Sequence, residues 1–296
     1  LDVTDLSARD LNAVLTLAQV DISKLGRPLA DKGVALIFEK PSNRTRHSME
    51  MAVVQLGGHP IFTRGEEVGF DDRETVEDVT RIMAGYHHVI AARVFAHSVL
   101  QRMARVSSVP IINMLSEQSH PLQAIADVLT MRQEIGGLHQ KTVAWIGDYN
   151  NVARSLVEAC ALEGMHIRLG CPKGYGADDG ELNRISKLGA ASVEQHSSAQ
   201  IAAIGAHAVH TDVFVSMGQE AETAKRMIDF ANFRVDASVM AVADKSAIFM
   251  HCLPAHREIE VTAEVIDGAQ SRVVSQAHNR MHAARGVLAH LMGVTI

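Results

Sequence analysis

The stretch that most constrains the fold is a short apolar run that stops abruptly in a polar turn. Val34 to Phe38 is apolar and rich in β-branched residues, and Lys40 and Pro41 break the run, which is typical of a buried strand that ends in a turn. Ser42 is a good N-cap for a following helix, whose buried stripe recurs at helical spacing: Met49, Val53 and Leu56. The sequence therefore predicts a strand that runs directly into a helix.

The first turn of this helix carries groups that attract an anion. It contains Ser42, Asn43, Arg44, Thr45 and Arg46, and it also offers the backbone N–H groups and the positive dipole end of a helix N-terminus. Guanidinium groups and hydroxyls bind phosphate well, so phosphate is the expected guest. An ordinary capped helix with solvated arginines explains the same short motif, so the interpretation needs support from elsewhere in the chain.

The strand-then-helix pattern recurs along the chain, which indicates parallel α/β sheets. Its 296 residues favour two domains over one. We predict an α/β fold of two doubly wound domains, each a parallel sheet with helices on both faces, joined by interdomain helices. The expected parts are residues 1–135, residues 136–275 after the Gly136–Gly137 pair, and a C-terminal helix in 276–296 that packs back on the first domain. Further strands are expected at Val89–Val94, Val109–Asn113, Thr142–Ile146, Ile167–Leu169, Ala208–Val215 and Ala247–Met250, a polar loop at Ile61–Phe70, and a last helix after Arg280.

Composition narrows the class of partner. The net charge is −6 and aromatic residues make up only 4% of the chain, which argues against nucleic acid or an anionic membrane as the main partner. No uninterrupted apolar run reaches the roughly 18 residues of a membrane span. Three cysteines without a CxxC pair fit a reducing compartment, so we expect a cytoplasmic location.

Polar residues follow several of the other predicted strands. His120 precedes Pro121 at a helix start, with Gln123 one turn further on, although a histidine there is often only a polar cap. The segment GDYNN after Thr142–Ile146 lacks the G-x-G-x-x-G pattern, so nicotinamide binding is not expected. Two more strands end in TDVFVSMGQE and HCLPAHR. Because open α/β sheets bind ligands beyond the carboxyl ends of their strands, these loops are candidate binding loops.

Five motifs occur in one order between positions 42 and 254: S-N-R-T-R, H-P-L-Q, G-D-Y-N-N, D-V-F-V-S-M-G and H-C-L-P, followed by H-N-R at 278–280. Together they resemble the aspartate/ornithine carbamoyltransferase family, and within it the ornithine branch. The first two motifs are shared across the family and indicate carbamoyl phosphate. The S-M-G and H-C-L-P motifs indicate ornithine.

The resemblance implies transfer of the carbamoyl group from carbamoyl phosphate to the δ-amine of L-ornithine, which gives citrulline and phosphate. It implies no cofactor and no metal, and a cytoplasmic homotrimer, or a multiple of trimers, in arginine metabolism. The carbamoyl phosphate residues that it implies are Ser42, Asn43, Arg44, Thr45, Arg93, His120, Gln123, Cys252, Leu253 and Arg280. The ornithine residues that it implies are Asn151, Asp212, Ser216 and Met217. The catalytic residues that it implies are Arg93, His120, Asp212 and Cys252.

The sequence departs from the family pattern at three places. Asn43 stands where the family usually has threonine, and Phe214 stands where tryptophan is common. The family also carries a glutamine that a neighbouring subunit supplies to the phosphate site, and the Ile61–Arg73 loop contains none. The residue of this loop that replaces it is not evident from the sequence.

The sequence is also compatible with other functions. The acceptor amine could instead belong to aspartate, putrescine or an acylated ornithine. A protein that only binds anions could keep the same fold, and a zinc site at His251, Cys252 and His256 lacks a second ligand pair with suitable spacing. The sequence leaves undecided whether the role is anabolic or catabolic, how large the oligomer is beyond a trimer, and how far the domains close.

Overall fold

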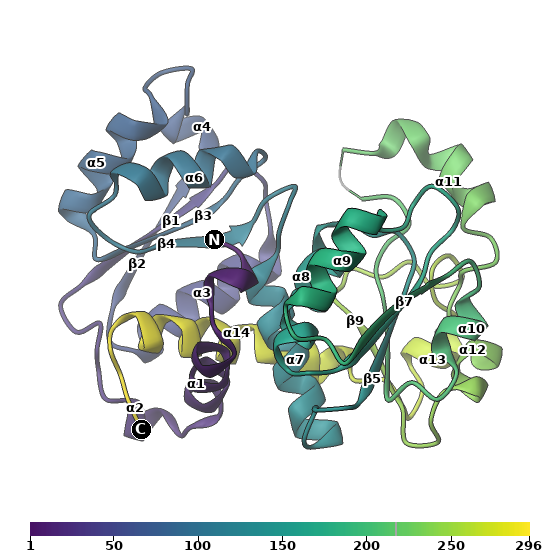
Figure 1. Ribbon diagram of the computed structural model, residues 1–296. Helices are drawn as coiled ribbons and strands as arrows, with labels where there is room; N and C mark the ends of the chain where they lie inside the picture. The colour runs from purple at the N-terminus through teal and green to yellow at the C-terminus, as the bar shows by residue number, and fades with distance from the viewer. Residues whose placement is uncertain (217) are drawn as a thin grey trace. The chain divides into compact units, whose positions relative to one another are not determined.

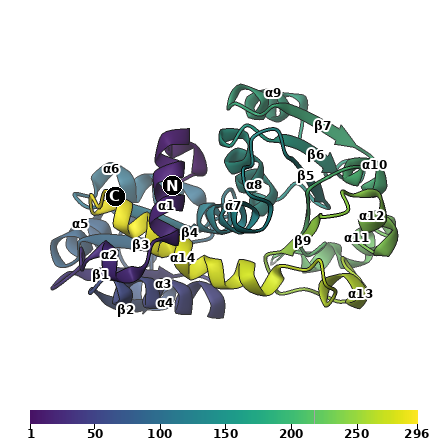
Figure 2. The ribbon, with the colours of Figure 1, turned by 90° about the horizontal axis from the view of Figure 1, so that it is seen from below.

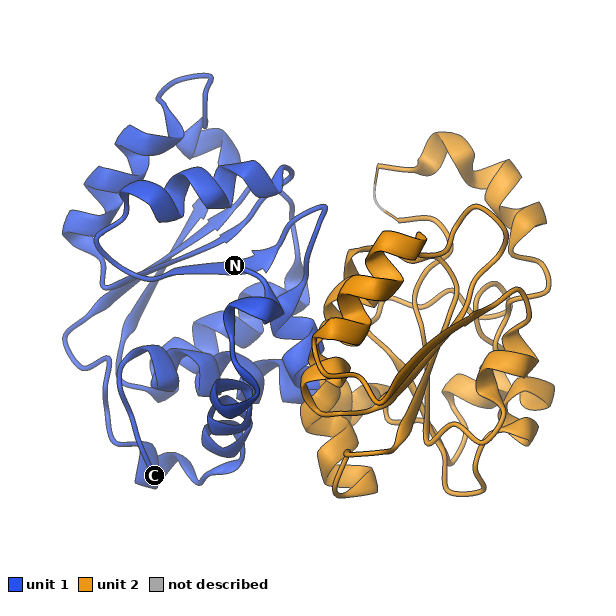
Figure 3. Ribbon diagram, in the orientation of Figure 1, with its two compact units in different colours: residues 1–126, 278–296 blue, residues 127–277 orange. Residues whose placement is uncertain are grey.

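A computed structural model describes residues 1–216 and 218–296 and divides the chain into two compact units (Figure 3). Unit 1 holds residues 1–126 and 278–296, and unit 2 holds residues 127–277. The chain passes between the units inside helix α7 (Pro121–Ile135) and again inside helix α14 (Val273–Leu291). The domain ends expected from the sequence, residues 135 and 275, lie at the end of α7 and in the first turn of α14.

Unit 1 is built on a parallel sheet with the strand order β2-β1-β3-β4 (Figure 1). The strands are β1 (Gly33–Phe38), β2 (His59–Arg64), β3 (Val89–Arg93) and β4 (Ile111–Leu115). The central strands β1 and β3 are buried along almost their whole length, as expected for strands covered on both faces. Phe38 pairs with Arg93, so the loops that follow these two strands begin side by side.

Helices cover both faces of the unit 1 sheet. Val34 and Leu36 of β1 pack into one core, and the alternate residues Ala35 and Ile37 pack into the core on the opposite face. The first core is closed by α1 (Ala8–Gln19), α2 (Ile22–Leu25), α3 (Asn43–Gln55) and the C-terminal part of α14. The second is closed by α4 (Gly65–Val68), α5 (Val76–Tyr86) and α6 (His97–Val106).

Unit 2 has a second parallel sheet, with the order β7-β6-β5-β8-β9. Its strands are β5 (Thr142–Ile146), β6 (His166–Gly170), β7 (Ser192–His196), β8 (Ala208–Thr211) and β9 (Ile248–His251). Ile146 pairs with Thr211, and Thr211 pairs with His251. Three adjacent strands therefore end level with one another, and the residues after them start from one line at the sheet edge.

The helices of unit 2 also lie on both faces of their sheet. They are α8 (Asn151–Leu162), α9 (Asp179–Lys187), α10 (Ala199–Ala203), α11 (Thr223–Asp229), α12 (Ala237–Val242) and α13 (Ala263–Ile266). Buried side chains of α10, α12 and α13 share one core with Ile146 and Phe249. Figure 2 shows α8 and α9 on the other side of the sheet. The predicted fold class, two doubly wound α/β domains, is confirmed.

The elements expected from the sequence were wrong at two edge strands, at one short helix and at the ends of two further elements. The expected loop at Ile61–Phe70 contains the end of strand β2 and the short helix α4, and strand β7 was not anticipated. Both missed strands are edge strands with half-exposed, partly polar side chains, so they lack an apolar run. Strand β8 ends at Thr211 rather than Val215, and α14 begins at Val273, which places Arg280 inside the helix.

Among the helices in the described part of the chain, none combines the length and the apolar character that crossing a bilayer requires.

A helix crossing in unit 1 provides a test of the fold. Figure 2 shows helix α1 crossing α14. At Gly286 of α14, an added Cβ atom would lie 2.5 Å from the Val14 carbonyl oxygen and 3.0 Å from the backbone nitrogen of Ala18. We expect Gly286→Ala to destabilise the protein by about 1–3 kcal/mol, because backbone atoms must move apart. Chemical denaturation of the variant and the parent protein measures the difference.

Gly85→Ala is the matched control, since Gly85 is an exposed glycine in α5 with nothing within 4 Å of its added Cβ. It should be neutral or more stable by up to about 1 kcal/mol, because alanine loses less backbone entropy in a helix. Equal stability of the two variants would contradict the close crossing of α1 and α14.

Candidate functional site

The turn between β1 and α3 forms a helix N-terminus suited to an anion. Ser42 caps α3, and its Oγ accepts a hydrogen bond from the backbone N–H of Thr45 at 3.4 Å. Asn43 and Arg44 are exposed on the first turn, whereas Thr45 is buried. The exposed side chains therefore surround the positive end of the helix dipole, as the sequence predicted.

The two arginines of this turn differ in their surroundings. The Arg46 side chain lies over the ring of Phe62, at 3.7 Å from its centroid, and its Nε donates to Glu50 at 2.8 Å. Arg46 therefore has an aromatic and an acidic partner within unit 1, and its part in anion binding stays a prediction. Glu50 lies four residues after Arg46 on the same helix, a spacing at which side chains of opposite charge pair.

Buried polar side chains from four segments converge beside this turn. The Oγ1 of Thr45 accepts hydrogen bonds from Arg93, at the end of β3 (3.4 Å), and from Arg280, in α14 (3.0 Å). Arg280 also donates to the Oε1 of Gln123 in α7 at 2.6 Å. Tertiary folding thus brings together side chains from α3, β3, α7 and α14 within unit 1, with two buried guanidiniums among them.

His120 lies at the start of α7 in the same unit and is 5% exposed. Its backbone carbonyl accepts from the N–H of Gln123 at 3.1 Å, which keeps the two residues on one helical turn. Burial, together with the charges of Arg280 and Arg93, lowers the pKa of His120 well below its ordinary value. The ring is therefore neutral near pH 7, and a neutral imidazole can donate one hydrogen bond without adding a third buried charge.

Unit 2 places a second set of polar groups after its central strands. Asp212 follows β8 and is 8% exposed, and the Sγ of Cys252, directly after β9, donates to its Oδ1 at 3.1 Å. The Nδ2 of Asn150 donates to the other carboxylate oxygen at 2.9 Å. Three adjacent strand ends therefore contribute to one carboxylate, amide and thiol cluster.

The remaining predicted residues of unit 2 are less closely tied to this cluster. Asn151 is the first residue of α8 and is half-buried, and Ser216 is half-buried in the loop after β8, where its N–H donates to Gln219 at 3.0 Å. Leu253 follows Cys252 with a left-handed φ of 59°. Met217, which was also assigned to ornithine, lies outside the described residues.

Sequence reasoning missed Asn150. Its Oδ1 caps α8 by accepting from the N–H groups of Val152 and Ala153, both at 3.0 Å, while its amide donates to Asp212. The available signal was the preference for asparagine at an N-cap, which favours Asn150 as the residue before the helix.

Sequence reasoning also missed Arg226, which anchors the loop after β8. This buried side chain donates to Asp148 at 2.7 Å and to the Phe214 carbonyl oxygen at 3.1 Å. Burial raises the pKa of Asp148, and the hydrogen bond from Arg226 opposes that rise. An arginine in a polar helical segment gave no signal of this contact in the sequence.

Asp212, His251 and Cys252 carry ligand-type atoms within 4.8 Å of one another, so a metal site was tested against the donor set. Both ring nitrogens of His251 already have hydrogen-bond partners, the Leu253 N–H at 2.9 Å and Glu260 at 3.2 Å. A metal ion would have to displace one of them. The trio therefore fits a hydrogen-bonded cluster better than a metal centre.

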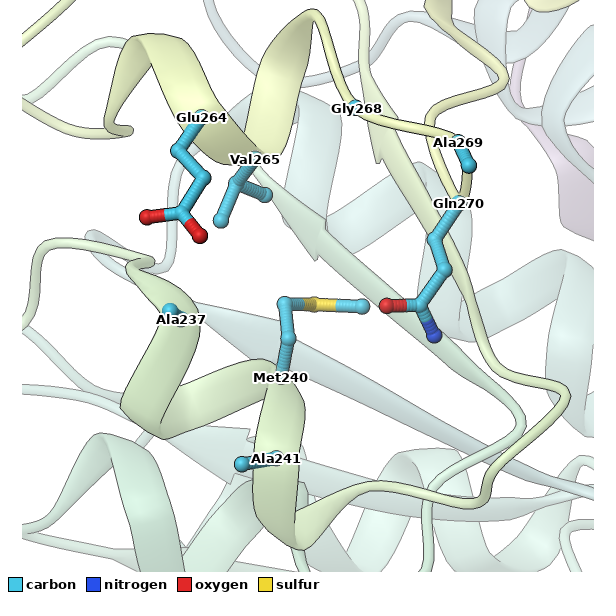
Figure 4. A pocket seen from close by; sticks show the side chains of 8 residues that line it. All are labelled: Ala237, Met240, Ala241, Glu264, Val265, Gly268, Ala269 and Gln270. Carbon is cyan, nitrogen blue, oxygen red and sulfur yellow. The ribbon is translucent and has the colours of Figure 1, made fainter.

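A pocket of about 250 Å³ lies elsewhere in unit 2, between α12, α13 and the loop after α13 (Figure 4). Met240 and Gln270 point toward each other across it, and Glu264 stands at its side. None of the predicted site residues is part of its lining: Ala237, Met240, Ala241, Glu264, Val265, Gly268, Ala269 and Gln270.

Comparisons with known proteins match two family models to successive parts of the chain. Residues 1–133 match the family model described as aspartate/ornithine carbamoyltransferase, carbamoyl-P binding domain. Residues 139–291 match the model described as aspartate/ornithine carbamoyltransferase, Asp/Orn binding domain. The two matches cover nearly the whole chain.

Individual relatives are similar over the same length. An ornithine carbamoyltransferase of Thermus thermophilus is 44% identical over 294 residues, which cover 99% of this chain and 96% of the relative. The crystal structure of an ornithine carbamoyltransferase from Thermus thermophilus superposes with a TM-score of 0.88 at 41% identity, covering 98% of this chain and 97% of that one. The structure of the Pyrococcus furiosus ornithine carbamoyltransferase gives a TM-score of 0.92 at 38% identity, covering 98% and 96%. With both domain models matched in order and close relatives aligned end to end, this chain belongs to the aspartate/ornithine carbamoyltransferase family of enzymes.

Proposed function

We propose that the enzyme transfers the carbamoyl group of carbamoyl phosphate to the δ-amine of L-ornithine, giving L-citrulline and phosphate. The observation that carries this proposal is the convergence in unit 1 of an exposed helix N-terminus with buried Arg93, Arg280 and neutral His120. A substrate in which a phosphate adjoins a carbonyl needs an anion-binding helix N-terminus next to hydrogen-bond donors for the carbonyl oxygen. The names of the relatives support ornithine as the acceptor.

The phosphate end of the substrate binds at the first turn of α3. Ser42, Asn43, Arg44 and Thr45 supply hydroxyl, amide, guanidinium and backbone N–H donors to it. Because phosphate is also the leaving group, the same donors stabilise the negative charge that grows as the carbon–oxygen bond breaks. Asn43 replaces the usual threonine and keeps a side-chain donor at this position.

The carbonyl end binds against the buried polar groups. Arg93, His120 and Thr45 polarise the carbonyl oxygen, where charge develops during attack, and Gln123 accepts from the carbamoyl nitrogen. Arg280 orients Gln123 through their 2.6 Å hydrogen bond and also contacts the substrate. A neutral His120 suits this role, since it donates a hydrogen bond at physiological pH without competing with the arginines for the phosphate charge.

Ornithine binds in unit 2 at Asn151, Asp212, Ser216 and Met217. The δ-amine binds between Asp212 and Cys252, and Leu253 lies beside this attacking amine. In the reaction the neutral δ-amine forms a bond to the carbonyl carbon, the bond to phosphate breaks, and the nitrogen gives up one proton, which the leaving phosphate accepts. Asp212 and Cys252 act as catalytic residues with Arg93 and His120. The homotrimer, the cytoplasmic location and the role in arginine biosynthesis stay predictions from the family resemblance.

The function is tested by carbamoyl transfer from labelled carbamoyl phosphate to ornithine, acetylornithine, putrescine and aspartate in parallel. We expect citrulline as the dominant product, because Asp212 and Cys252 are placed for a side-chain amine. Transfer mainly to another amine would overturn the roles given to Asp212 and Ser216. No transfer to any acceptor would favour a protein that only binds anions.

Arg44→Ala tests the phosphate assignment. We expect carbamoyl phosphate affinity to fall roughly 10- to 100-fold in calorimetry, because one charged hydrogen-bond donor is lost. Arg46→Ala is the control on the same turn, and it should leave affinity nearly unchanged because Arg46 faces Phe62 and Glu50. Equal losses in both variants, or none in either, would contradict the site at Arg44.

The pH dependence tests the attacking group. The δ-amine resembles a lysine amine of pKa ~10.4, so only about 0.4% is neutral at pH 8, which costs about 3.3 kcal/mol. We expect kcat/KM for ornithine to rise from about pH 6 until a group near pH 8 to 9 has titrated. The lowered pKa of His120 keeps its ring neutral over this range, so it adds no second rise near its ordinary pKa. A flat profile would count against attack by the neutral amine.

A further inference from the structure

The turn that presents Cys252 is held by a buried histidine and a buried glutamate with no role in the proposed chemistry. His251 ends β9, Glu260 lies in the segment after the H-C-L-P motif, and both side chains are completely buried. The Oε1 of Glu260 accepts from the backbone N–H of His256 at 2.5 Å and is 3.2 Å from the Nε2 of His251. Glu260 therefore links His251 to His256 across the loop that contains Cys252.

The hydrogen bonds determine the state of the His251 ring. The Nδ1 atom accepts from the backbone N–H of Leu253 at 2.9 Å, so Nδ1 must present a lone pair rather than a proton. The ring proton then resides on Nε2, which donates to the Glu260 carboxylate. Without that acceptor, the ring could place its proton on Nδ1 and would lose its contact with Leu253.

Leu253 needs this contact because its backbone is in an unfavourable conformation. Its φ of 59° lies in the left-handed region, which costs a leucine about 1–2 kcal/mol. Such a conformation persists only where the surrounding structure enforces it. The hydrogen bond from Leu253 to His251 spans Cys252, so it also sets the direction of the thiol that donates to Asp212.

Backbone hydrogen bonds fix the segment that carries Glu260. The backbone carbonyl of Glu260 accepts from the Val235 N–H at 2.9 Å, and Thr262 donates to the Val235 carbonyl at 3.1 Å. In addition, Gln276 accepts from the His251 N–H at 2.9 Å. Glu260 and His251 are thus fixed to rigid backbone, whereas Cys252 and Leu253 between them are half-buried.

We propose that Glu260 is a positioning residue that acts through His251 to hold the Cys252–Leu253 turn in the geometry used for carbamoyl transfer. The consequence for catalysis rests on the proposed function, because it assumes that this turn lies beside the attacking amine. The structural link from Glu260 to Cys252 does not depend on the identity of the acceptor. The two parts can therefore be tested separately.

The first experiment compares Glu260→Ala with Glu260→Gln. Glutamine keeps an oxygen acceptor for His251 and His256, so kcat should stay within about threefold of the parent enzyme. Alanine removes the acceptor, and we expect kcat to fall on the order of tenfold or more, with a smaller change in KM for ornithine, because the reacting groups are misplaced. Equal kcat in the two variants would overturn the proposal.

The second readout is alkylation of Cys252 in the absence of substrates. Cys160 and Cys171 are buried, so the half-buried Cys252 is the cysteine that reacts in the folded protein. We expect iodoacetamide to react several-fold faster with Glu260→Ala, since the thiol is no longer held against Asp212. Glu264→Ala, which removes an exposed carboxylate from the following helix, should leave the rate unchanged. An unchanged rate in Glu260→Ala would overturn the link to Cys252.

A pair of His251 variants tests whether Glu260 acts on Cys252 through His251 and Leu253. This test remains informative if Glu260→Ala fails to fold. The amide oxygen of His251→Asn can replace Nδ1 and accept from Leu253, whereas the longer side chain of His251→Gln reaches Glu260 instead. We expect the asparagine variant to keep more activity and the slower alkylation. The reverse order would contradict an action through Leu253.

These outcomes separate the two proposals. Faster alkylation of Glu260→Ala, in a protein whose parent form does not carbamoylate ornithine, would support the positioning role and reject the function. Citrulline formation by the parent enzyme, with unchanged alkylation and turnover in Glu260→Ala, would support the proposed function and reject the positioning role of Glu260.

Discussion

In each sheet, parallel pairing makes neighbouring strands end at the same edge, and both groups of polar residues depend on this constraint. In unit 1 the pairing of Phe38 with Arg93 sets the α3 turn beside the arginine at the end of β3. In unit 2 the level ends of β5, β8 and β9 bring Asn150, Asp212 and Cys252 together. Hydrogen bonds between neighbouring strands therefore fix the distance between residues that are far apart in the sequence.

The electrostatics of unit 1 follow from burial. Removing a guanidinium from water is costly unless it gains hydrogen bonds, and Arg93 and Arg280 share the hydroxyl of Thr45. Their charges help to keep His120 neutral. An anionic substrate would offset the cost of burying two positive charges, so this arrangement favours binding of a phosphate.

The polar cluster of unit 2 depends on hydrogen bonds to buried carboxyl groups and on backbone geometry. Asp212 is held by an amide and a thiol, and the thiol sits on a turn whose left-handed leucine is supported by His251 and Glu260. Arg226 similarly holds the loop after β8 through Asp148 and the Phe214 carbonyl. Two of these supporting residues, Glu260 and Arg226, lie outside the motifs that the sequence analysis singled out.

The sequence by itself determined the two α/β domains, the central strands and the α3 turn, because buried strands and capped helices are encoded by local apolar spacing and N-cap residues. It did not determine the edge strands β2 and β7, whose half-exposed side chains lack an apolar run. Local spacing could not distinguish Arg44 from Arg46, which only the family resemblance separated, and it could not single out Asn150, Arg226 and Glu260. The roles of these five side chains depend on contacts with residues that are distant in the chain or on which side of a turn they face. Only the tertiary structure decides those contacts, since they arise when separate segments pack together.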